Sequence, residues 1–293
     1  MSTITKNIKE CFITRNEKEN LFVCFDFSQL EICGLAELSG DEVLINELNN
    51  GVDIHSANAE EWKKQPFDSI PNKDKVRKQA KVMTFQLQYG AGAPKMAETL
   101  NITKKEAVDF IYSYYGKYKG VFNYHEDLRL EKMAQGNPRD INDYIMLHPN
   151  ISNHPMGRLY TIKVKEFEGK LYYPLTELKN YPVQGFSTGD LVPLVVNKIV
   201  RVCEEYFKNR QVPKLVSTVH DDFTLEINSE YIYEVLAIVE EVFNNLHDYF
   251  KELFDYELKV IYNYDVKVGS NFANMQKLTR KEVRELIKEE VTN

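Results

Sequence analysis

The sequence lacks any apolar run long enough to cross a membrane, and its first residues do not have the pattern of a secretion signal. It has only four cysteines, and no two of them are spaced as Cys-x-x-Cys. This scarcity argues against a disulfide-rich scaffold and a zinc ribbon, and it indicates a cytoplasmic protein with reduced thiols. Internal repeats and low-complexity linkers are also absent. The 293 residues, 43% of them hydrophobic, suffice for one large domain or two closely packed subdomains.

An excess of positive charge is lacking too, because the formal net charge is −7. This argues mildly against nucleic-acid binding, since contacts to phosphate require Lys and Arg. The charges are unevenly distributed, however. Basic residues gather between Lys63 and Lys81, whereas acidic residues gather between Glu230 and Glu257 and at the carboxyl end. Such a cluster is most often a solvated face, so it does not identify a partner by itself.

Strand patterns lie at both ends of the chain, with helical patterns between them. Apolar runs predict strands at 21–25, 215–219, 223–227 and 259–268. A β-hairpin is predicted from 159–164 and 170–173, and a basic helix begins near 72–75 and ends at Gly90. We therefore predict an α+β fold in which an antiparallel sheet with its own helices carries an inserted helical subdomain.

Two aspartates stand where predicted strands end. Asp26 closes the first apolar run, and Asp221 lies in the tight turn between the strands at 215–219 and 223–227. Each aspartate alone would normally be a turn or capping residue. Together they offer the hard oxygen ligands that Mg²⁺ prefers, so the pair is a candidate for two ions. In nucleotidyl transfer one ion lowers the pKa of a primer 3′-hydroxyl and the other neutralises the leaving pyrophosphate.

The basic helix carries a stripe of side chains spaced four residues apart, namely Arg77, Lys81, Phe85 and Tyr89. At about 1.5 Å rise per residue the stripe spans about 18 Å, enough for a triphosphate, a sugar and a base edge. Arg77 and Lys81 would bind phosphate, Phe85 would pack on the sugar or base, and Tyr89 would lie near the primer–template stack. The alternative is an ordinary amphipathic helix whose two aromatic residues lie in the core.

These motifs, in this order and spacing, resemble those of family A DNA polymerases, the bacterial polymerase I group and its phage relatives. The stretch 25–31 is similar to the family motif Asp-Tyr-Ser-Gln-Ile-Glu. The further matches are the basic helix, the turn 219–222, and the segments 53–55, 180–185 and 266–272. The resemblance extends from about residue 8 to 278. Departures at Cys33, Thr84, Gln86, Thr176 and Asp222 make the chain more similar to the phage side of the family.

The resemblance implies a role for each matched position. Asp26 and Asp221, helped by the Phe27 carbonyl, would hold two Mg²⁺ ions, with Mn²⁺ as a substitute, and Lys81 would join the aspartates in catalysis. Glu31 would be the steric gate that excludes a ribose 2′-hydroxyl. The incoming nucleotide would be bound by these residues: Gln29, Glu31, His55, Arg77, Lys81, Phe85 and Tyr89. Phenylalanine at position 85 would disfavour dideoxynucleotides. Primer–template DNA would be contacted by Asn180, Gln184, His220 and Asp222.

The resemblance also implies a subdomain plan and partners. Its expected parts are 1–48 as the first part of the palm, 49–175 as the fingers with the basic helix at 73–90, 176–278 as the second part of the palm, and 279–293 as a helical tail. The thumb and exonuclease domain that precede these motifs in the family are absent from the sequence. We therefore expect a split polymerase, with those parts on a separate amino-terminal chain. Primer–template DNA and dNTPs are the other expected partners; a membrane is not.

Two other functions remain open at this point. A DNA-binding or replisome scaffold would keep the fold without activity, as a decayed gene or truncated fragment would. Intact Asp26, Glu31, Arg77, Lys81 and Asp221 argue against that alternative, because a scaffold needs none of them. A single-subunit RNA polymerase is the other alternative, and Glu31 argues against it.

Overall fold

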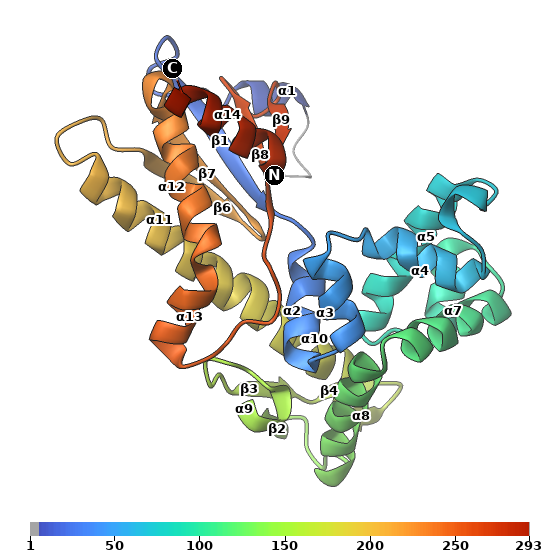
Figure 1. The fold of residues 1–293 in the computed structure, drawn as a ribbon. Helices are drawn as coiled ribbons and strands as arrows, with labels where there is room; N and C mark the ends of the chain where they lie inside the picture. Colours follow the sequence, from blue (N-terminus) through green and yellow to red (C-terminus); the bar gives the residue numbers. More distant parts are fainter. Residues whose placement is uncertain (1–5, 293) are drawn as a thin grey trace. The chain divides into compact units, whose positions relative to one another are not determined.

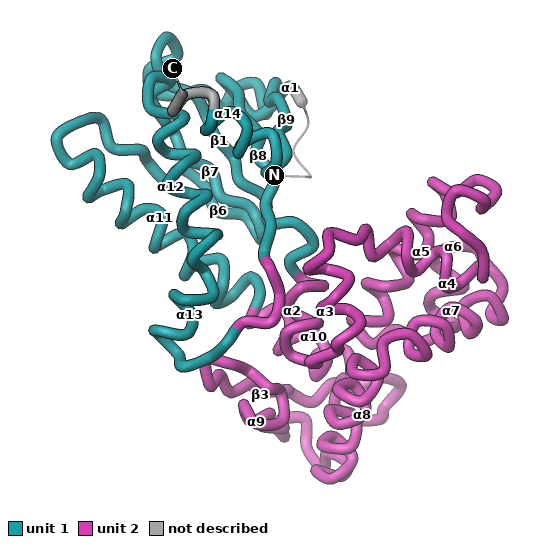
Figure 2. Tube along the Cα trace, viewed as in Figure 1, with its two compact units in different colours: residues 1–30, 187–257, 262–293 teal, residues 31–186, 258–261 magenta. Residues whose placement is uncertain are grey.

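The computed structural model describes residues 6–292 and divides into two compact units (Figures 1 and 2). Unit 1 comprises the described residues up to 30 together with 187–257 and 262–292, and unit 2 comprises 31–186 and 258–261. Each unit is built from separate stretches of the chain. The α+β class predicted from the sequence is confirmed, because one unit is organised around a sheet and the other is mainly helical.

Unit 1 is built on a five-stranded antiparallel sheet with the strand order β6-β7-β1-β8-β9. The strands are β1 (Asn20–Phe27), β6 (Lys214–Val219), β7 (Asp222–Asn228), β8 (Tyr264–Gly269) and β9 (Gln276–Thr279). Its helices are α1 (Lys6–Glu10), η2 (Gly185–Leu191, which begins in unit 2), α11 (Val192–Tyr206), η3 (Ser229–Tyr231), α12 (Ile232–Asn244), α13 (Leu246–Phe254) and α14 (Arg280–Thr292).

The two faces of this sheet differ in character, because successive side chains of a strand point to opposite faces. On one face the ring of Phe25 stacks on Phe223 at 4.9 Å between centroids, and Phe27 lies 5.1 Å from Phe243 of α12. This face is therefore the core, covered by helices (Figure 1). Cys24 and Asp26 lie on the opposite face, where a cavity opens.

Unit 2 is mainly helical. Its helices are α2 (Leu30–Ser39, whose first residue belongs to unit 1), α3 (Glu42–Asn49), α4 (Ile54–Lys63), η1 (Phe67–Ser69), α5 (Lys73–Gln88), α6 (Ala93–Leu100), α7 (Lys104–Lys117), α8 (Lys119–Ala134), α9 (Pro149–Ser152) and α10 (Leu175–Gln184). Two short antiparallel pairs join β2 (Tyr144–Leu147) to β3 (Tyr160–Lys163), and β4 (Lys165–Phe167) to β5 (Lys170–Tyr172). The predicted basic helix is present as α5.

The hairpin predicted from 159–164 and 170–173 is wrong in its pairing. The chain turns at Glu168 and Gly169, both with positive φ, so the strand before that turn is β4 rather than β3. β3 pairs with β2 instead, and Ile162 faces Ile145 in that register. The physical reason is that a tight turn pairs the residues immediately beside it, whereas β3 lies further back along the chain.

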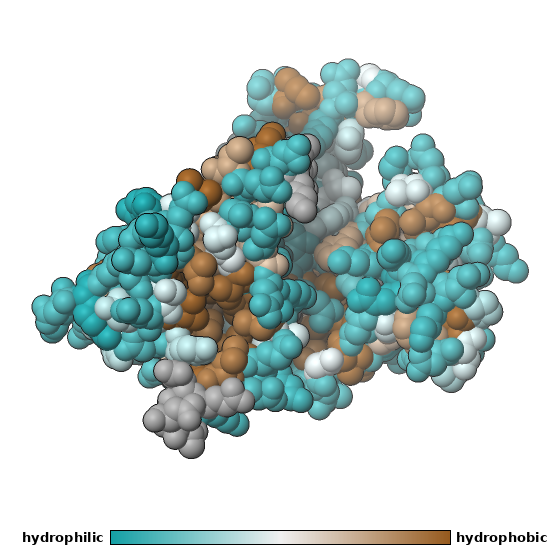
Figure 3. All heavy atoms as spheres, turned by 90° about the horizontal axis from the view of Figure 1, so that it is seen from above, coloured by the Kyte–Doolittle hydropathy of each residue, from teal (hydrophilic) through white to brown (hydrophobic). Residues whose placement is uncertain are grey.

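Among the helices of residues 6–292, none is long and apolar enough to cross a membrane. The face shown in Figure 3 is largely hydrophilic, with hydrophobic residues in separate patches. Scattered apolar side chains of this kind are normal for a folded protein surface.

Candidate active site

The two predicted aspartates are brought together at one end of the sheet in unit 1. In the β1–β7 register Asp26 faces Asp222, and Asp221 lies in the two-residue turn that connects β6 to β7. The backbone N–H of Phe27 donates a hydrogen bond of 3.0 Å to the carbonyl of Asp221. The end of β1 is therefore tied directly to the turn, and both aspartates are held by sheet backbone rather than by a free loop.

Two other predicted site residues adopt backbone conformations that non-glycine residues rarely take. His220, the first residue of the turn, has φ 56°, and Gln29, the second residue after β1, has φ 53°. Left-handed backbone at such residues costs free energy and tends to occur where function requires it. In the turn it is also the geometry that lets two residues connect antiparallel strands.

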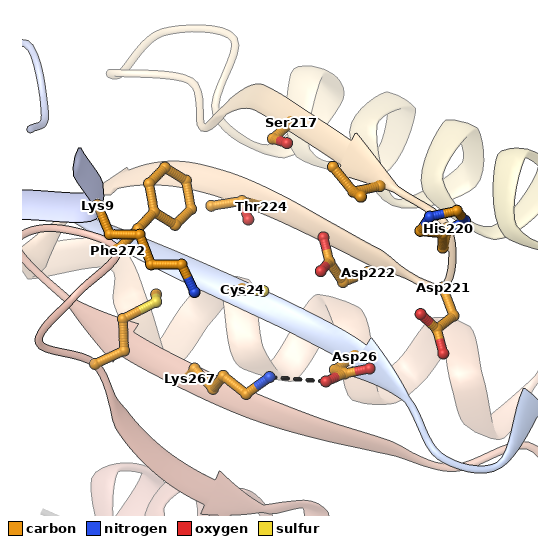
Figure 4. Close-up of a pocket in the computed structure, with 12 residues that line it drawn as sticks. Lys9, Cys24, Asp26, Ser217, His220, Asp221, Asp222, Thr224, Lys267 and Phe272 are labelled. Carbon is orange, nitrogen blue, oxygen red and sulfur yellow. Dashed lines mark hydrogen bonds and ion pairs between the residues drawn. The ribbon is translucent and has the colours of Figure 1, made fainter. Parts of the chain in front are cut away.

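A cavity of about 300 Å³ opens on this face of the sheet (Figure 4). Asp26, Asp221 and Asp222 all line it, together with His220. Partial burial, with the neighbouring charge of Asp26 adding to it, raises the pKa of both Asp221 and Asp222 above the ordinary aspartate value. Ionisation of these carboxyl groups in the cavity therefore costs free energy, and a bound cation would reduce that cost.

A residue that the sequence did not single out occupies the same cavity. Lys267 on β8 faces Cys24 in the strand register and places its Nζ 2.7 Å from Oδ2 of Asp26. Burial lowers the pKa of Lys267, but the bond to Asp26 outweighs that effect, so the net shift is upward. A lysine in the alternating run 264–268 looks like an ordinary solvated strand residue, which is why no sequence signal indicated its contact.

The donor set at this end of the sheet fits a divalent cation of the Mg²⁺ type. Within residues 6–292, no three His, Cys, Asp or Glu side chains are gathered so that they could hold a metal ion alone. Mg²⁺ does not require such a group, because it keeps several waters and commonly binds one or two carboxylates plus substrate phosphates. Asp26 and Asp221 supply the carboxylates, and the described residues form no cluster of cysteine or histidine side chains that would favour another metal.

In unit 2, the start of α5 is joined to the start of α4 by an ion pair. Arg77 donates to both carboxylate oxygens of Asp53, at 2.5 and 3.0 Å. Asp53 also caps α4 by accepting from the backbone N–H of His55 and from the hydroxyl of Ser56. Although burial raises it, these hydrogen bonds hold the pKa of Asp53 at about 2. Asp53 thus fixes the guanidinium of Arg77, an orienting role that sequence analysis missed because the two residues lie far apart in the chain.

The predicted stripe on α5 is present, and its aromatic members adjoin His55. The ring of Phe85 lies 5.7 Å from that of His55 and 6.2 Å from that of Tyr89, and Lys81 Nζ lies 5.9 Å from the Phe85 centroid. Phe85 and Tyr89 are only partly buried, so the alternative of a simple core helix does not describe them. The buried residues of α5 are instead Val76, Ala80, Met83, Thr84, Leu87 and Gln88.

His55 is expected to be neutral at physiological pH. It is 4% exposed, and burial together with the charge of Lys81 lowers its pKa to about 4. Because the unfolded value is about 6.5, the unfolded chain binds a proton more readily between these values. Stability should therefore fall as the pH drops from about 6.5 to 4, by about 3 kcal/mol from this residue. Unfolding followed by the fluorescence of Trp62, the single tryptophan, should show this loss in the wild type.

The matched variant is His55→Gln, which should lack that part of the pH dependence. The comparison is needed because buried His125 in the same unit also has a lowered pKa, by burial first and then by Lys179. A ring-proton titration of His55 near pH 6.5 would contradict the expectation.

Glu31 and Tyr89 form a pair within unit 2. The hydroxyl of Tyr89 donates to Oε2 of Glu31, and the side chain of Gln88 approaches the Glu31 carbonyl at 3.4 Å. Burial, and then the bond to Glu31, raises the pKa of Tyr89. The end of α5 therefore holds the Glu31 carboxylate in one orientation.

The remaining predicted residues lie on α10, also in unit 2. Asn180 donates to the side chain of Gln184 at 3.3 Å, one helical turn away. Gln184 is exposed, so its contact surface is open to a ligand. The predicted site residues thus form two groups. Unit 1 holds Asp26, Phe27, Gln29, His220, Asp221 and Asp222, and unit 2 holds Glu31, His55, Arg77, Lys81, Phe85, Tyr89, Asn180 and Gln184.

Comparison with known proteins identifies the family of this chain. The family model described as DNA polymerase family A matches residues 1–274. The chain belongs to DNA polymerase family A. Among curated relatives, it is 29% identical over 238 residues to DNA polymerase I of Geobacillus stearothermophilus, covering 81% of this chain and 25% of that protein. For DNA polymerase I of Bacillus subtilis (strain 168) the identity is 27% over 237 residues, with the same coverage of 81% and 25%.

The fold is shared with a solved structure. The POL domain of Pol1 from M. smegmatis, in complex with DNA primer-template and dNTP, matches with a TM-score of 0.69 and 21% identity. The match covers 92% of this chain and 42% of that chain. The present chain spans about a quarter of the length of the curated relatives that it matches. The separate amino-terminal chain expected from the sequence stays a prediction.

Proposed function

We propose that this chain carries out template-directed DNA synthesis, joining dNTPs to a primer 3′-hydroxyl. The observation that carries the proposal is the tie between Phe27 N–H and the Asp221 carbonyl, which holds Asp26 and Asp221 at one end of the sheet. Family membership supports the same reaction class. A scaffold that only bound DNA would not need two carboxylates close together in one cavity.

Asp26, Asp221 and the Phe27 carbonyl are the groups that would hold two Mg²⁺ ions, with Mn²⁺ as a substitute. When bound, the ions supply charge neutralisation at the attacking and leaving oxygens of the transfer. The chain's own contribution is to hold the two carboxylates in fixed positions. Sheet backbone restricts both of them, so little reorganisation is needed when substrate arrives.

The second group of residues is assigned to the incoming nucleotide. Arg77, fixed in orientation by Asp53, and the exposed amine of Lys81 would bind its phosphates. His55, neutral near pH 7, would take part as a hydrogen-bonding group rather than as a cation. Gln29 is assigned to the same phosphates. Phe85 would then pack on the sugar or base.

We assign palm and fingers as the sequence analysis expected them, with the sheet of unit 1 in the palm and α5 in the fingers. Primer–template DNA is proposed to contact Asn180, Gln184, His220 and Asp222. The exposed side chains of Gln184 and His220 support this assignment, since DNA contacts must be accessible.

Glu31→Ala should raise the use of ribonucleotides relative to deoxynucleotides by at least about tenfold. The reason is that Tyr89 holds the Glu31 side chain in place, so a 2′-hydroxyl would collide with a side chain that cannot move aside. Single-nucleotide incorporation with matched ribo- and deoxynucleotides measures the ratio. Tyr89→Phe should raise it less, because Glu31 stays but loses its anchor. An unchanged ratio in Glu31→Ala would contradict the gate.

The proposed function is tested by primer extension with the full chain, a primer–template, dNTPs and Mg²⁺. Template-dependent products support it. Absence of extension, in the presence of either Mg²⁺ or Mn²⁺ and with DNA binding retained, leaves a split enzyme and the scaffold. Addition of the proposed amino-terminal chain separates them, because only a split enzyme would then extend the primer.

A further inference from the structure

The position that a cation would take on Asp26 is occupied by a lysine of the same chain. Nζ of Lys267 lies 2.7 Å from Oδ2 of Asp26, as the dashed line in Figure 4 shows. The strand register places Lys267 opposite Cys24, two residues from Asp26 on the same face of β1. The side chains are 36% and 33% exposed, so water and ions reach the pair. The pairing of β8 with β1 therefore places the Lys267 side chain next to Asp26.

The charges around this pair make the loss of the Lys267 ammonium group unfavourable. Asp221 and Asp222 line the same cavity as Asp26, and Lys9 is the other lysine that lines it. Lys277 of β9 faces Lys267 in the strand register, but its Nζ lies 2.6 Å from Oδ2 of Asp265 instead. Without Lys267, Asp26 would face the other carboxylates and lose its bonded cation. Like charges at close range are destabilising, so some cation would be drawn to the cavity more strongly.

We propose that Lys267 is an internal counter-cation that holds Asp26 in the metal-free protein and competes with the divalent ion for it. The proposal rests on the proposed function, because it takes Asp26 as an ion ligand. The ammonium group of Lys267 and a divalent ion on Asp26 would share one carboxylate and repel each other, so binding of the ion weakens the contact between Lys267 and Asp26. The free energy of the contact between Lys267 and Asp26 therefore reduces the binding free energy of the ion. Lys267 thereby sets the ion concentration at which the site fills.

The test is a titration of the full chain with Mn²⁺ alone, followed by the electron paramagnetic resonance signal of the free ion. Lys267→Met should bind Mn²⁺ about fivefold more tightly than the wild type, the size expected for one partly exposed charge-assisted hydrogen bond. Lys277→Met combined with Asp265→Asn is the matched control, since it removes the neighbouring ion pair of the same face and leaves no new charge opposite Asp26, and its affinity should equal the wild type. Lys267→Arg keeps the charge and should also stay near the wild type.

A thermal melt gives an independent readout. Without Mn²⁺, Lys267→Met should melt below the wild type, and saturating Mn²⁺ should raise its melting temperature by more than it raises that of the wild type. Equal Mn²⁺ affinity in Lys267→Met and the wild type would overturn the proposal and leave the ion site standing. Asp26→Asn tests separately whether Asp26 binds the ion at all. If Mn²⁺ binding survives that change at full strength, the ion is not held by Asp26, and the proposed ion ligation falls together with the competition.

Discussion

Asp26→Asn should reduce primer extension by at least about 10³-fold, because it removes the charge of an ion ligand, which costs several kcal/mol in the transition state. Asparagine has nearly the same shape as aspartate, so β1 and its backbone bond to the turn should remain. Asp221→Asn should have a similar effect. Rates of single-nucleotide incorporation at saturating dNTP and Mg²⁺ provide the measurement.

The control for this experiment comes from the next strand. Asp265 faces Asp26 in the β1–β8 register and is paired with Lys277, so it is a carboxylate on the same face with no assigned role. Asp265→Asn should keep activity within about threefold of the wild type, the effect of one exposed ion pair. Equal losses in Asp26→Asn and Asp265→Asn would mean that general charge, rather than the position of Asp26, governs activity.

Strands β1, β6 and β7 and the proximity of Asp26 to Asp221 could be predicted because their signals are local, whereas no pattern predicted β9. Asp26 and Asp221 each follow an apolar run, and a two-residue turn between two such runs determines which residues face each other. The predicted strand at 259–268 shows the limit of this reasoning. Only 264–269 form β8, while 258–261 group with unit 2. In that unit the backbone N–H groups of Lys259 and Val260 donate to the side chain of Glu37 instead of to a strand.

Contacts between distant segments could not be predicted. The bonds of Lys267 to Asp26 and of Arg77 to Asp53 join residues whose spacing follows no helical or strand period, so pattern analysis has nothing to detect. The helical apolar pattern of 232–254 also conceals a break in the helix. α12 ends at Asn244 and α13 begins at Leu246, although the apolar period continues through both. Periodicity indicates which residues are buried, but it does not indicate where the chain changes direction.

The second prediction with a large expected effect concerns the ion pairs between the last helix, α14, and Glu240. Glu240 of α12 is buried and accepts hydrogen bonds from Arg280 at 2.7 and 3.1 Å, from Arg284 and from the hydroxyl of Tyr264. Burial raises the pKa of Glu240, but these bonds hold it below the usual range. Glu240→Leu should lower the free energy of unfolding by about 3 kcal/mol, because it leaves the buried charge of Arg280 without its carboxylate. Urea unfolding of the full chain, followed by circular dichroism, measures the loss.

Two further variants separate a buried ion pair from simple loss of packing. Arg284 is 49% exposed, so Arg284→Ala should cost less than about 1 kcal/mol. In the double variant Glu240→Leu with Arg280→Met, most of the loss should be recovered, since an apolar pair of similar size replaces both charges. Hydrogen exchange should rise in β8 and β9 of Glu240→Leu, while the Trp62 transition of unit 2 stays unchanged. Unaltered exchange in those strands would mean that α14, beyond the 1–274 region matched by the family, does not stabilise the sheet that carries the aspartates.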